Sequence, residues 1–169
     1  DGAGSIEVGK SQRDVICHLS AREIRMDAIR TTIRRFMDRE VMPNIEAWEE
    51  AGSFPRALYK VAGEVGLLAL GFPEELGGVD STAMTTLVTV EELARAGSGG
   101  LIAGLLSHGI GLPPIIALAN DALALEIAPP ILRGDKICAL AVTEPGGGSD
   151  VANLRTTATR DGDDYIVRG

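Results

Sequence analysis

The sequence predicts a mainly α fold, in which an N-terminal helical bundle domain is followed by the first strands of a β-barrel-like domain. Two observations support this prediction. Up to about residue 135, apolar residues recur every three to five positions, which is the spacing of one helix face. Beyond it, short apolar or threonine-rich runs alternate with turn residues, as in strands. We therefore expect a domain boundary near residues 134–135, with an all-α domain over 20–135 and the start of a β domain over 136–169.

The first helix has a clear predicted start. Residues 1–19 are expected to form a flexible arm, and Ser20 and Glu23 then match the S-x-x-E capping box, in which each side chain satisfies a backbone amide of the first turn. Pro43 should bend or interrupt this helix, because proline cannot donate the backbone hydrogen bond of a helix interior. The predicted apolar face comprises Ile24, Ile29, Ile33, Phe36, Met37 and Val41.

The remaining helices are delimited by turn residues. A helix restarts around residues 53–55, where Pro55 suits a first turn. Gly66, Gly97 and Gly134 are natural C-terminal stops for this helix and two later ones. The later predicted helices cover residues 81–96, 101–119 and 121–133, and residues 73–78 form a turn-rich loop.

The last part of the chain contains β signals. Residues 137–142 form a short apolar run typical of a buried strand. Residues 156–160 and 165–167 alternate around an Asp161-Gly162 turn signal, which predicts a hairpin. One strand and one hairpin are only marginally stable alone. We therefore expect this β domain to be incomplete and the natural protein to be longer.

Charge and cysteine content narrow the function classes. The formal charge is 16 − 24 = −8, which argues against a nucleic-acid backbone as the main partner. A small anionic cofactor stays possible, because backbone amides can bind a phosphate locally. Cys17 and Cys138 are far apart and fit no metal spacing, so we expect a reduced, cytoplasmic location. The longest apolar stretch, residues 110–132, is broken by prolines and polar residues, so we expect no membrane span.

The segment AVTEPGGGSD, residues 141–150, carries the chemical signal. A predicted strand delivers the Thr143 hydroxyl into three consecutive glycines, which precede a second hydroxyl at Ser149. Glycines permit positive φ and let a ligand approach the backbone closely, and successive amides can bind an anion. An ordinary loop is the competing interpretation. No helix opens after the glycines and no Gly-Lys-Ser/Thr follows them, so neither a dinucleotide-binding fingerprint nor a P-loop fits.

Three other polar residues have structural interpretations that we favour. Glu144 and Asp150 could act as acid or base groups, but we expect them to shape the loop by bonding backbone amides. His108 could line a ligand pocket, although a lone histidine is more often a capping or packing residue. Metal ligands are not expected anywhere in the sequence.

AVTEPGGGSD closely resembles the signature of the acyl-CoA dehydrogenase family. That signature has a further small residue downstream, where this sequence has Asn153 instead. The segments FPRALYKVAGEVGLLALGFPEELGG (54–78), EELARAGSG (91–99) and LRTTATRDGDDYIVRG (154–169) are also similar to this family and occur in its order. The resemblance implies an N-terminal helical domain, a middle β domain and a C-terminal helical bundle that this chain lacks. It also implies FAD as cofactor. The residues implied to contact FAD are Leu140, Val142, Thr143, Gly148 and Ser149, and Ser149 is also implied to approach the substrate.

The implied reaction is α,β-dehydrogenation of an acyl-CoA thioester. The family's catalytic base lies in the missing bundle, so we expect no catalytic residue within these 169 residues and no activity from them alone. An electron-transfer flavoprotein is the implied electron acceptor, and a homo-oligomer, dimer or tetramer, is implied. There are two alternatives to a dehydrogenase. One is an acyl-CoA oxidase or flavin monooxygenase on the same fold, and the other is a non-catalytic helical interaction subunit. The small residues from Gly97 to Gly104 suggest room for a bulky or long acyl group.

Overall fold

The computed structural model describes residues 25–169 of the chain. The predicted arm over residues 1–19 and the capping box of Ser20 and Glu23 lie outside the described residues. The chain divides into two compact units, Asp1–Cys138 and Ala139–Gly169, which are described separately below. This division falls a few residues beyond the position expected from the sequence.

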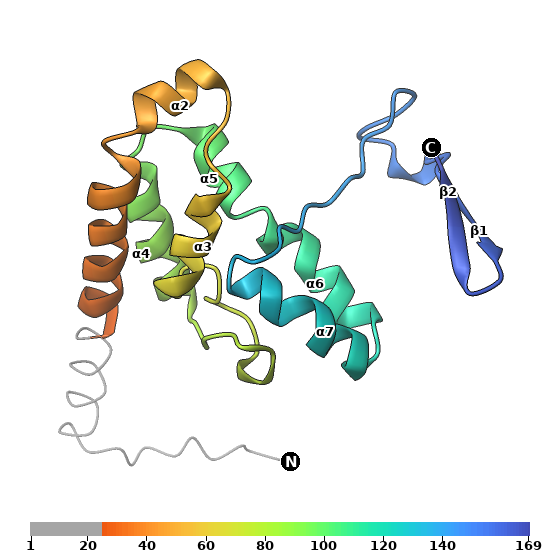
Figure 1. Ribbon diagram of the computed structural model, residues 1–169, viewed down its shortest axis with the longest axis horizontal. Helices are drawn as coiled ribbons and strands as arrows, with labels where there is room; N and C mark the ends of the chain where they lie inside the picture. Colours follow the sequence, from red (N-terminus) through yellow and green to blue (C-terminus); the bar gives the residue numbers. More distant parts are fainter. Residues whose placement is uncertain (1–24) are drawn as a thin grey trace, which may run out of the picture. The chain divides into compact units, whose positions relative to one another are not determined.

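The expected fold class is confirmed: the chain is mostly helical and has a short two-stranded sheet near its C-terminal end (Figure 1). A helix over residues 25–36 widens into a π-helical turn, Met37–Val41. The other helices of the first unit are α2 (Ile45–Ala51), α3 (Ala57–Glu64), a 3₁₀ turn (Glu74–Leu76), α4 (Ala83–Ala94), α5 (Gly99–Leu105), α6 (His108–Leu118) and α7 (Asp121–Leu132). The second unit contains a 3₁₀ turn (Val151–Asn153) and strands β1 (Thr157–Asp161) and β2 (Asp164–Arg168).

Local sequence signals account for most helix ends. Gly66, Gly97 and Gly134 have φ of 78°, 66° and 75°, which is the left-handed conformation that ends a helix and favours glycine. The predicted interruption at Pro43 is also found, because a turn separates the π-helical residues from α2. At the start of α4, Thr82 and Thr85 form a reciprocal capping box that the sequence pattern did not reveal, since position 85 is not Glu or Gln.

The predicted helix over residues 101–119 is wrong in one respect: it is two helices, α5 and α6, separated by a turn at Leu106 and Ser107. Apolar periodicity continues across this turn, so the pattern could not indicate it. Together the two helices span Gly99–Leu118 with a mean hydropathy of 1.8, which is long and apolar enough to cross a membrane by length and composition. The core helix of a soluble protein can have the same properties; 28% of the window is buried in the helical unit, and Leu101, Leu105 and Leu112 are among its buried residues.

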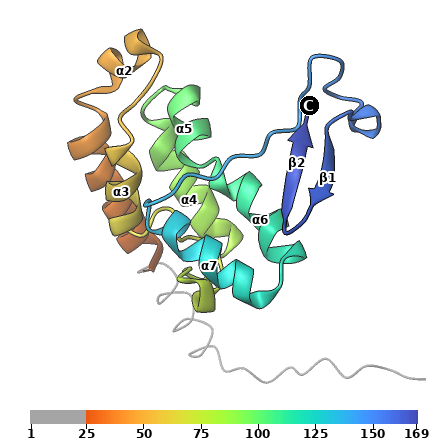
Figure 2. The ribbon, with the colours of Figure 1, turned by 45° about the vertical axis from the view of Figure 1, so that its right-hand side comes forward.

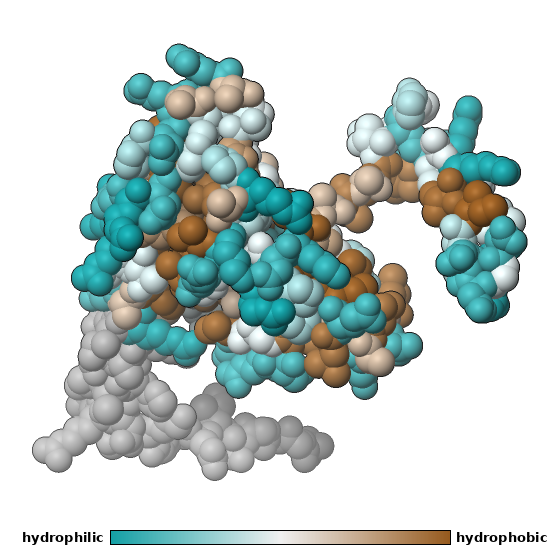
Figure 3. All heavy atoms as spheres, in the orientation of Figure 1, coloured by the Kyte–Doolittle hydropathy of each residue, from teal (hydrophilic) through white to brown (hydrophobic). Residues whose placement is uncertain are grey.

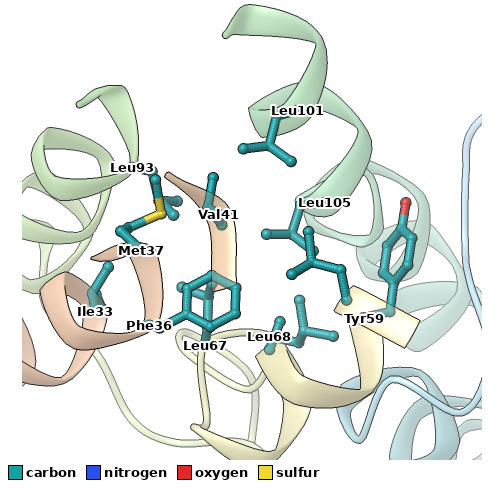
Figure 4. Close-up of a cluster of buried hydrophobic side chains, with 12 residues drawn as sticks. Ile33, Phe36, Met37, Val41, Tyr59, Leu67, Leu68, Leu93, Leu101 and Leu105 are labelled. Carbon is teal, nitrogen blue, oxygen red and sulfur yellow. The ribbon is translucent and has the colours of Figure 1, made fainter. Parts of the chain in front are cut away.

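Two hydrophobic cores hold the helical unit together. The first joins the helix over residues 25–36, α3, α4 and α5, and Figure 4 shows its side chains directed toward one another. Ile33, Phe36, Met37 and Val41 are buried there, which confirms this part of the apolar face predicted for the first helix; Ile24 lies outside the described residues. The second core lies between α7, the middle of α6 and the segment around Phe72. Figures 1 and 2 show α6 and α7 side by side, as this shared core requires.

A buried carboxylate links α4 to the first helix. The side chain of Glu92 is 1% exposed, yet it accepts hydrogen bonds from Arg34 Nη2 (2.6 Å) and Arg30 Nη1 (2.8 Å). Arg95 adds a longer contact of 3.4 Å. The hydrogen bonds from Arg34 and Arg30 outweigh the effect of burial and lower the pKa of Glu92 to about 2.

Replacing Glu92 with glutamine is expected to lower the free energy of unfolding by about 2 kcal/mol near neutral pH, since hydrogen bonds to charged groups contribute about 1.5–3 kcal/mol. The pKa of Glu92 is depressed in the folded state, from an ordinary value of 4.5. The contribution is therefore complete above pH 4.5 and decreases as the pH falls toward 2. Urea unfolding of the wild-type protein and Glu92→Gln between pH 7 and pH 2 should show that the difference between their free energies of unfolding shrinks as the pH falls.

Glu91 provides the matched control for this prediction. Its side chain is 60% exposed and contacts only Arg30 among the described basic residues. Glu91→Gln should therefore change stability by less than about 1 kcal/mol. Equal losses for the two variants, or a Glu92 effect that does not depend on pH, would contradict the assignment.

The second unit contains an antiparallel hairpin in which Asp161 pairs with Asp164 and Thr157 with Arg168 (Figure 2). The predicted hairpin is confirmed, but its two-residue loop is Gly162-Asp163 rather than Asp161-Gly162. Gly162 has a φ of 63°, which a glycine at the first loop position tolerates.

The predicted strand over residues 137–142 does not form. Within the described part of the chain these residues have no strand partner, and Ile137 and Leu140 are 40% and 51% exposed. A strand requires a neighbour for its backbone groups, and an apolar run alone does not supply one.

Candidate functional site

Residues 144–147 form a tight turn at the centre of the motif. The amide of Glu144 donates to the carbonyl oxygen of Gly147 (2.9 Å), and the amide of Gly147 donates back to Glu144 (3.1 Å). Pro145 and Gly146 occupy the tip of this turn. The motif is therefore an ordered turn followed by Gly148, Ser149 and Asp150.

The Glu144 side chain fixes this turn to the residues before β1. Its carboxylate accepts hydrogen bonds from the amides of Arg155 (2.8 Å) and Thr156 (2.7 Å) and from the Thr156 hydroxyl. The Thr156 hydroxyl and these amides lower the pKa of Glu144. The structural interpretation of Glu144 is thus confirmed. Asp150 differs in detail, because its carboxylate accepts from the side-chain amide of Asn153 rather than from a backbone amide.

The three glycines do not adopt the positive φ that was expected of them. None of Gly146, Gly147 and Gly148 has a positive φ. A Cβ atom at Gly146 would meet nothing within 4 Å, and one at Gly148 would come no closer than 3.7 Å, to the Thr143 methyl group. Neither backbone strain nor crowding within the described residues therefore requires glycine here. Close approach of a ligand to the backbone does provide a reason.

The residues predicted to contact a cofactor are accessible. Thr143, Gly148 and Ser149 are exposed, Val142 is half-buried, and Leu140 is 51% exposed. Within residues 25–169, the backbone amides of Gly148 and Ser149 donate no backbone hydrogen bond. Free amides beside exposed hydroxyls form a donor set that suits a phosphate or a flavin pyrimidine. The motif therefore fits the cofactor expected from the sequence, while the individual roles stay predictions.

His108 is a packing residue. It is 6% exposed, its Nε2 atom lies 2.9 Å from the carbonyl oxygen of Leu68, and its ring lies against Phe72. Burial lowers its pKa, so the ring is held neutral in the helical unit. Among the described residues, no group of three or more His, Cys, Asp or Glu side chains is placed to bind a metal.

The helical unit also contains an aromatic groove that the sequence did not reveal. Its volume is about 510 Å³, and Trp48, Phe54 and Tyr59 form part of its wall. Gly100 opens onto it, whereas a Cβ atom at Gly104 would lie 2.9 Å from the Phe54 ring. The expectation of space along residues 97–104 therefore applies to Gly97, Gly99 and Gly100 but not to Gly104. No sequence spacing predicts this groove, because its walls come from α2, α3 and α5.

Comparison with known proteins identifies relatives of this chain. Residues 25–135 match the family described as acyl-CoA dehydrogenase, N-terminal domain. The long-chain specific acyl-CoA dehydrogenase of rat mitochondria is 38% identical over 144 residues, which are 85% of this chain and 33% of the relative. A Mycobacterium smegmatis structure, provisionally assigned as an acyl-CoA dehydrogenase, is 49% identical with a TM-score of 0.78, over 85% of this chain and 38% of that one.

The acyl-CoA dehydrogenase of Bacillus anthracis, solved in complex with FAD, is 33% identical with a TM-score of 0.74, over 86% of this chain and 25% of that one. The chain thus spans about a third of the length of the curated relative it matches. Because the family match covers most of the chain and extends through all the helices of the first unit, the chain belongs to the acyl-CoA dehydrogenase family.

Proposed function

We propose that this chain forms part of the FAD and substrate site of an enzyme that catalyses α,β-dehydrogenation of an acyl-CoA thioester. The observation that carries the proposal is the glycine run at residues 146–148, which the packing of the described residues does not require. The cofactor of the Bacillus anthracis relative supports the choice of FAD.

The residues of the motif have distinct proposed roles. Thr143 donates its hydroxyl hydrogen bond to the pyrimidine side of the flavin, and the amides of Gly148 and Ser149 bind the pyrophosphate. Val142 packs beside the isoalloxazine ring, Leu140 also contacts FAD, and Ser149 also approaches the acyl thioester. When bound, FAD supplies the two-electron oxidation of the substrate. The protein holds and orients both molecules, and Glu144 keeps the turn in place through the amides of Arg155 and Thr156.

Several wider features are part of this proposal. We propose a cytoplasmic homo-oligomer, dimer or tetramer, that passes its electrons to an electron-transfer flavoprotein. Exposed large apolar side chains on α4 and α6 are consistent with packing against further protein, and Figure 3 shows apolar patches on the visible surface. Met84, Leu87, Ile110 and Leu118 are examples, at 57%, 59%, 65% and 87% exposure.

An absorbance spectrum of the full-length protein tests the reaction class. We expect flavin bands that bleach when an acyl-CoA is added without oxygen. Readmission of air separates two cases: slow recovery without an added acceptor indicates a dehydrogenase, and rapid recovery indicates an oxidase. An added electron-transfer flavoprotein should then be reduced by the dehydrogenase. A colourless protein that FAD cannot reconstitute would contradict the proposal and favour a non-catalytic interaction subunit.

A further inference from the structure

The segment that leads into the glycine-rich motif is held by α3 and α7 before it leaves the helical unit. A Cβ atom at Gly134 would overlap the carbonyl oxygen of Tyr59, and one at Gly63 would overlap that of Arg133, so α3 and the end of α7 meet backbone to backbone. Asp135 continues this attachment through an ion pair with Lys60 (2.5 Å). We refer to residues 133–138 as the exit segment.

The last contact of the exit segment is made by Ser107. Its hydroxyl donates a hydrogen bond of 2.8 Å to the carbonyl oxygen of Cys138. Cys138 is the final residue of the helical unit, and its side chain packs against the second core. Residues 139–143 that follow have no backbone hydrogen bond of their own within the described chain. Ser107 therefore marks the point where attachment to the helices ends.

The hydroxyl of Ser107 does not cap the N-terminus of α6. Ser107 precedes the first residue of α6, where a serine side chain usually accepts a hydrogen bond from an amide of the first helical turn. No such capping bond is formed by Ser107, whereas Ser98 before α5 does accept one, from the Leu101 amide (3.0 Å). The break between α5 and α6 thus places a hydroxyl where it can bind the exit segment.

This contact lies close in the chain to the residues proposed to bind FAD. Thr143 follows Cys138 by five residues, which span at most roughly 17 Å when fully extended. Because the chain is continuous, the position of the Cys138 carbonyl limits the region that Leu140, Val142 and Thr143 can reach. A rigid starting point reduces the conformational entropy that these residues lose on binding a ligand.

We propose that Ser107 is a positioning residue for the FAD-binding motif, acting through the carbonyl group of Cys138. This inference rests on the proposed function. It assigns a role in cofactor binding to a residue of the helical unit that does not itself belong to the motif.

The test compares three variants of the full-length protein: Ser107→Ala, which removes the hydroxyl; Ser107→Thr, which keeps it; and Ser98→Ala, which removes a comparable hydroxyl from the start of α5. The measurements are FAD affinity of the apoprotein, from flavin fluorescence quenching, and hydrogen exchange of the Glu144 and Gly147 amides without FAD, since these two amides are hydrogen-bonded within the turn. Thermal unfolding midpoints show how far each variant is destabilised.

We expect Ser107→Ala to weaken FAD binding by about 2- to 13-fold, the range for one net hydrogen bond, and to accelerate exchange of the hydrogen-bonded Glu144 and Gly147 amides. Ser107→Thr should restore both properties. Ser98→Ala should lower the unfolding midpoint without changing either. If Ser107→Ala had the same FAD affinity and the same exchange rates as the wild-type protein, this inference would be overturned and the proposed function would not. If the wild-type protein itself could not bind FAD, the proposed function would be overturned.

Discussion

Replacing Gly148 with valine is expected to weaken FAD binding at least about 100-fold while leaving the stability of the apoprotein nearly unchanged. That loss corresponds to about 2.8 kcal/mol of binding free energy. Gly148 lacks a positive φ, and its nearest neighbour for a Cβ atom is the Thr143 methyl group at 3.7 Å, so a Cβ atom fits the motif itself. The same side chain would occupy the space through which the pyrophosphate must reach the Gly148 and Ser149 amides. Equilibrium titration of the apoprotein with FAD measures the effect.

Gly146→Val is the matched control for this substitution. Gly146 lies at the tip of the turn between Glu144 and Gly147, has no positive φ, and a Cβ atom there meets nothing within 4 Å. We assign no cofactor contact to it, so FAD affinity should change by less than about 3-fold, or under 0.7 kcal/mol. Equal effects at the two positions would indicate that any bulk in the turn disturbs binding. Unchanged affinity in Gly148→Val would contradict the proposed contact.

Replacing Gly134 with alanine is expected to lower the free energy of unfolding by about 3 kcal/mol. Two costs combine at this position. The φ of 75° is strained for alanine, by about 1–2 kcal/mol. The new Cβ atom would also overlap the backbone of Tyr59, and such overpacking costs about 1–3 kcal/mol because α3 must move. Chemical denaturation followed by far-ultraviolet circular dichroism measures the loss.

Gly97→Ala separates these two costs. Gly97 has a similar φ of 66°, but a Cβ atom there meets nothing within 4 Å. Only the conformational strain applies, so a loss of about 1–2 kcal/mol is expected. If Gly134→Ala were no more destabilising than Gly97→Ala, the backbone contact between α3 and the exit segment would not contribute to stability.

Features encoded by neighbouring residues could be predicted from the sequence. The helix stops at Gly66, Gly97 and Gly134 follow from one residue type and its backbone preference. The hairpin follows from alternation around a glycine turn. Features that depend on distant residues could not be predicted. The Glu92 carboxylate is buried because Arg30 and Arg34 reach it from another helix, and no local pattern indicates that meeting.

The candidate site shows the same limit. Its location was clear, because hydroxyl groups and consecutive glycines stand together in residues 143–149. The reason why glycines occupy residues 146–148 could not be predicted, since backbone angles depend on the fold and none of the three has a positive φ. The hydrogen bond from Ser107 to Cys138 was also hidden, because it depends on a helix break that apolar periodicity does not reveal.

The meeting of Gly63 and Gly134 has a consequence for how this sequence can change over evolutionary time. Each glycine makes room for the backbone of the opposite element: the carbonyl oxygen of Arg133 in the exit segment faces Gly63, and that of Tyr59 in α3 faces Gly134. A lineage that gained a side chain at one position would separate α3 from the exit segment, and selection to keep the other position small would then relax. Related sequences should therefore either keep both glycines or have replaced both, so that the two positions covary.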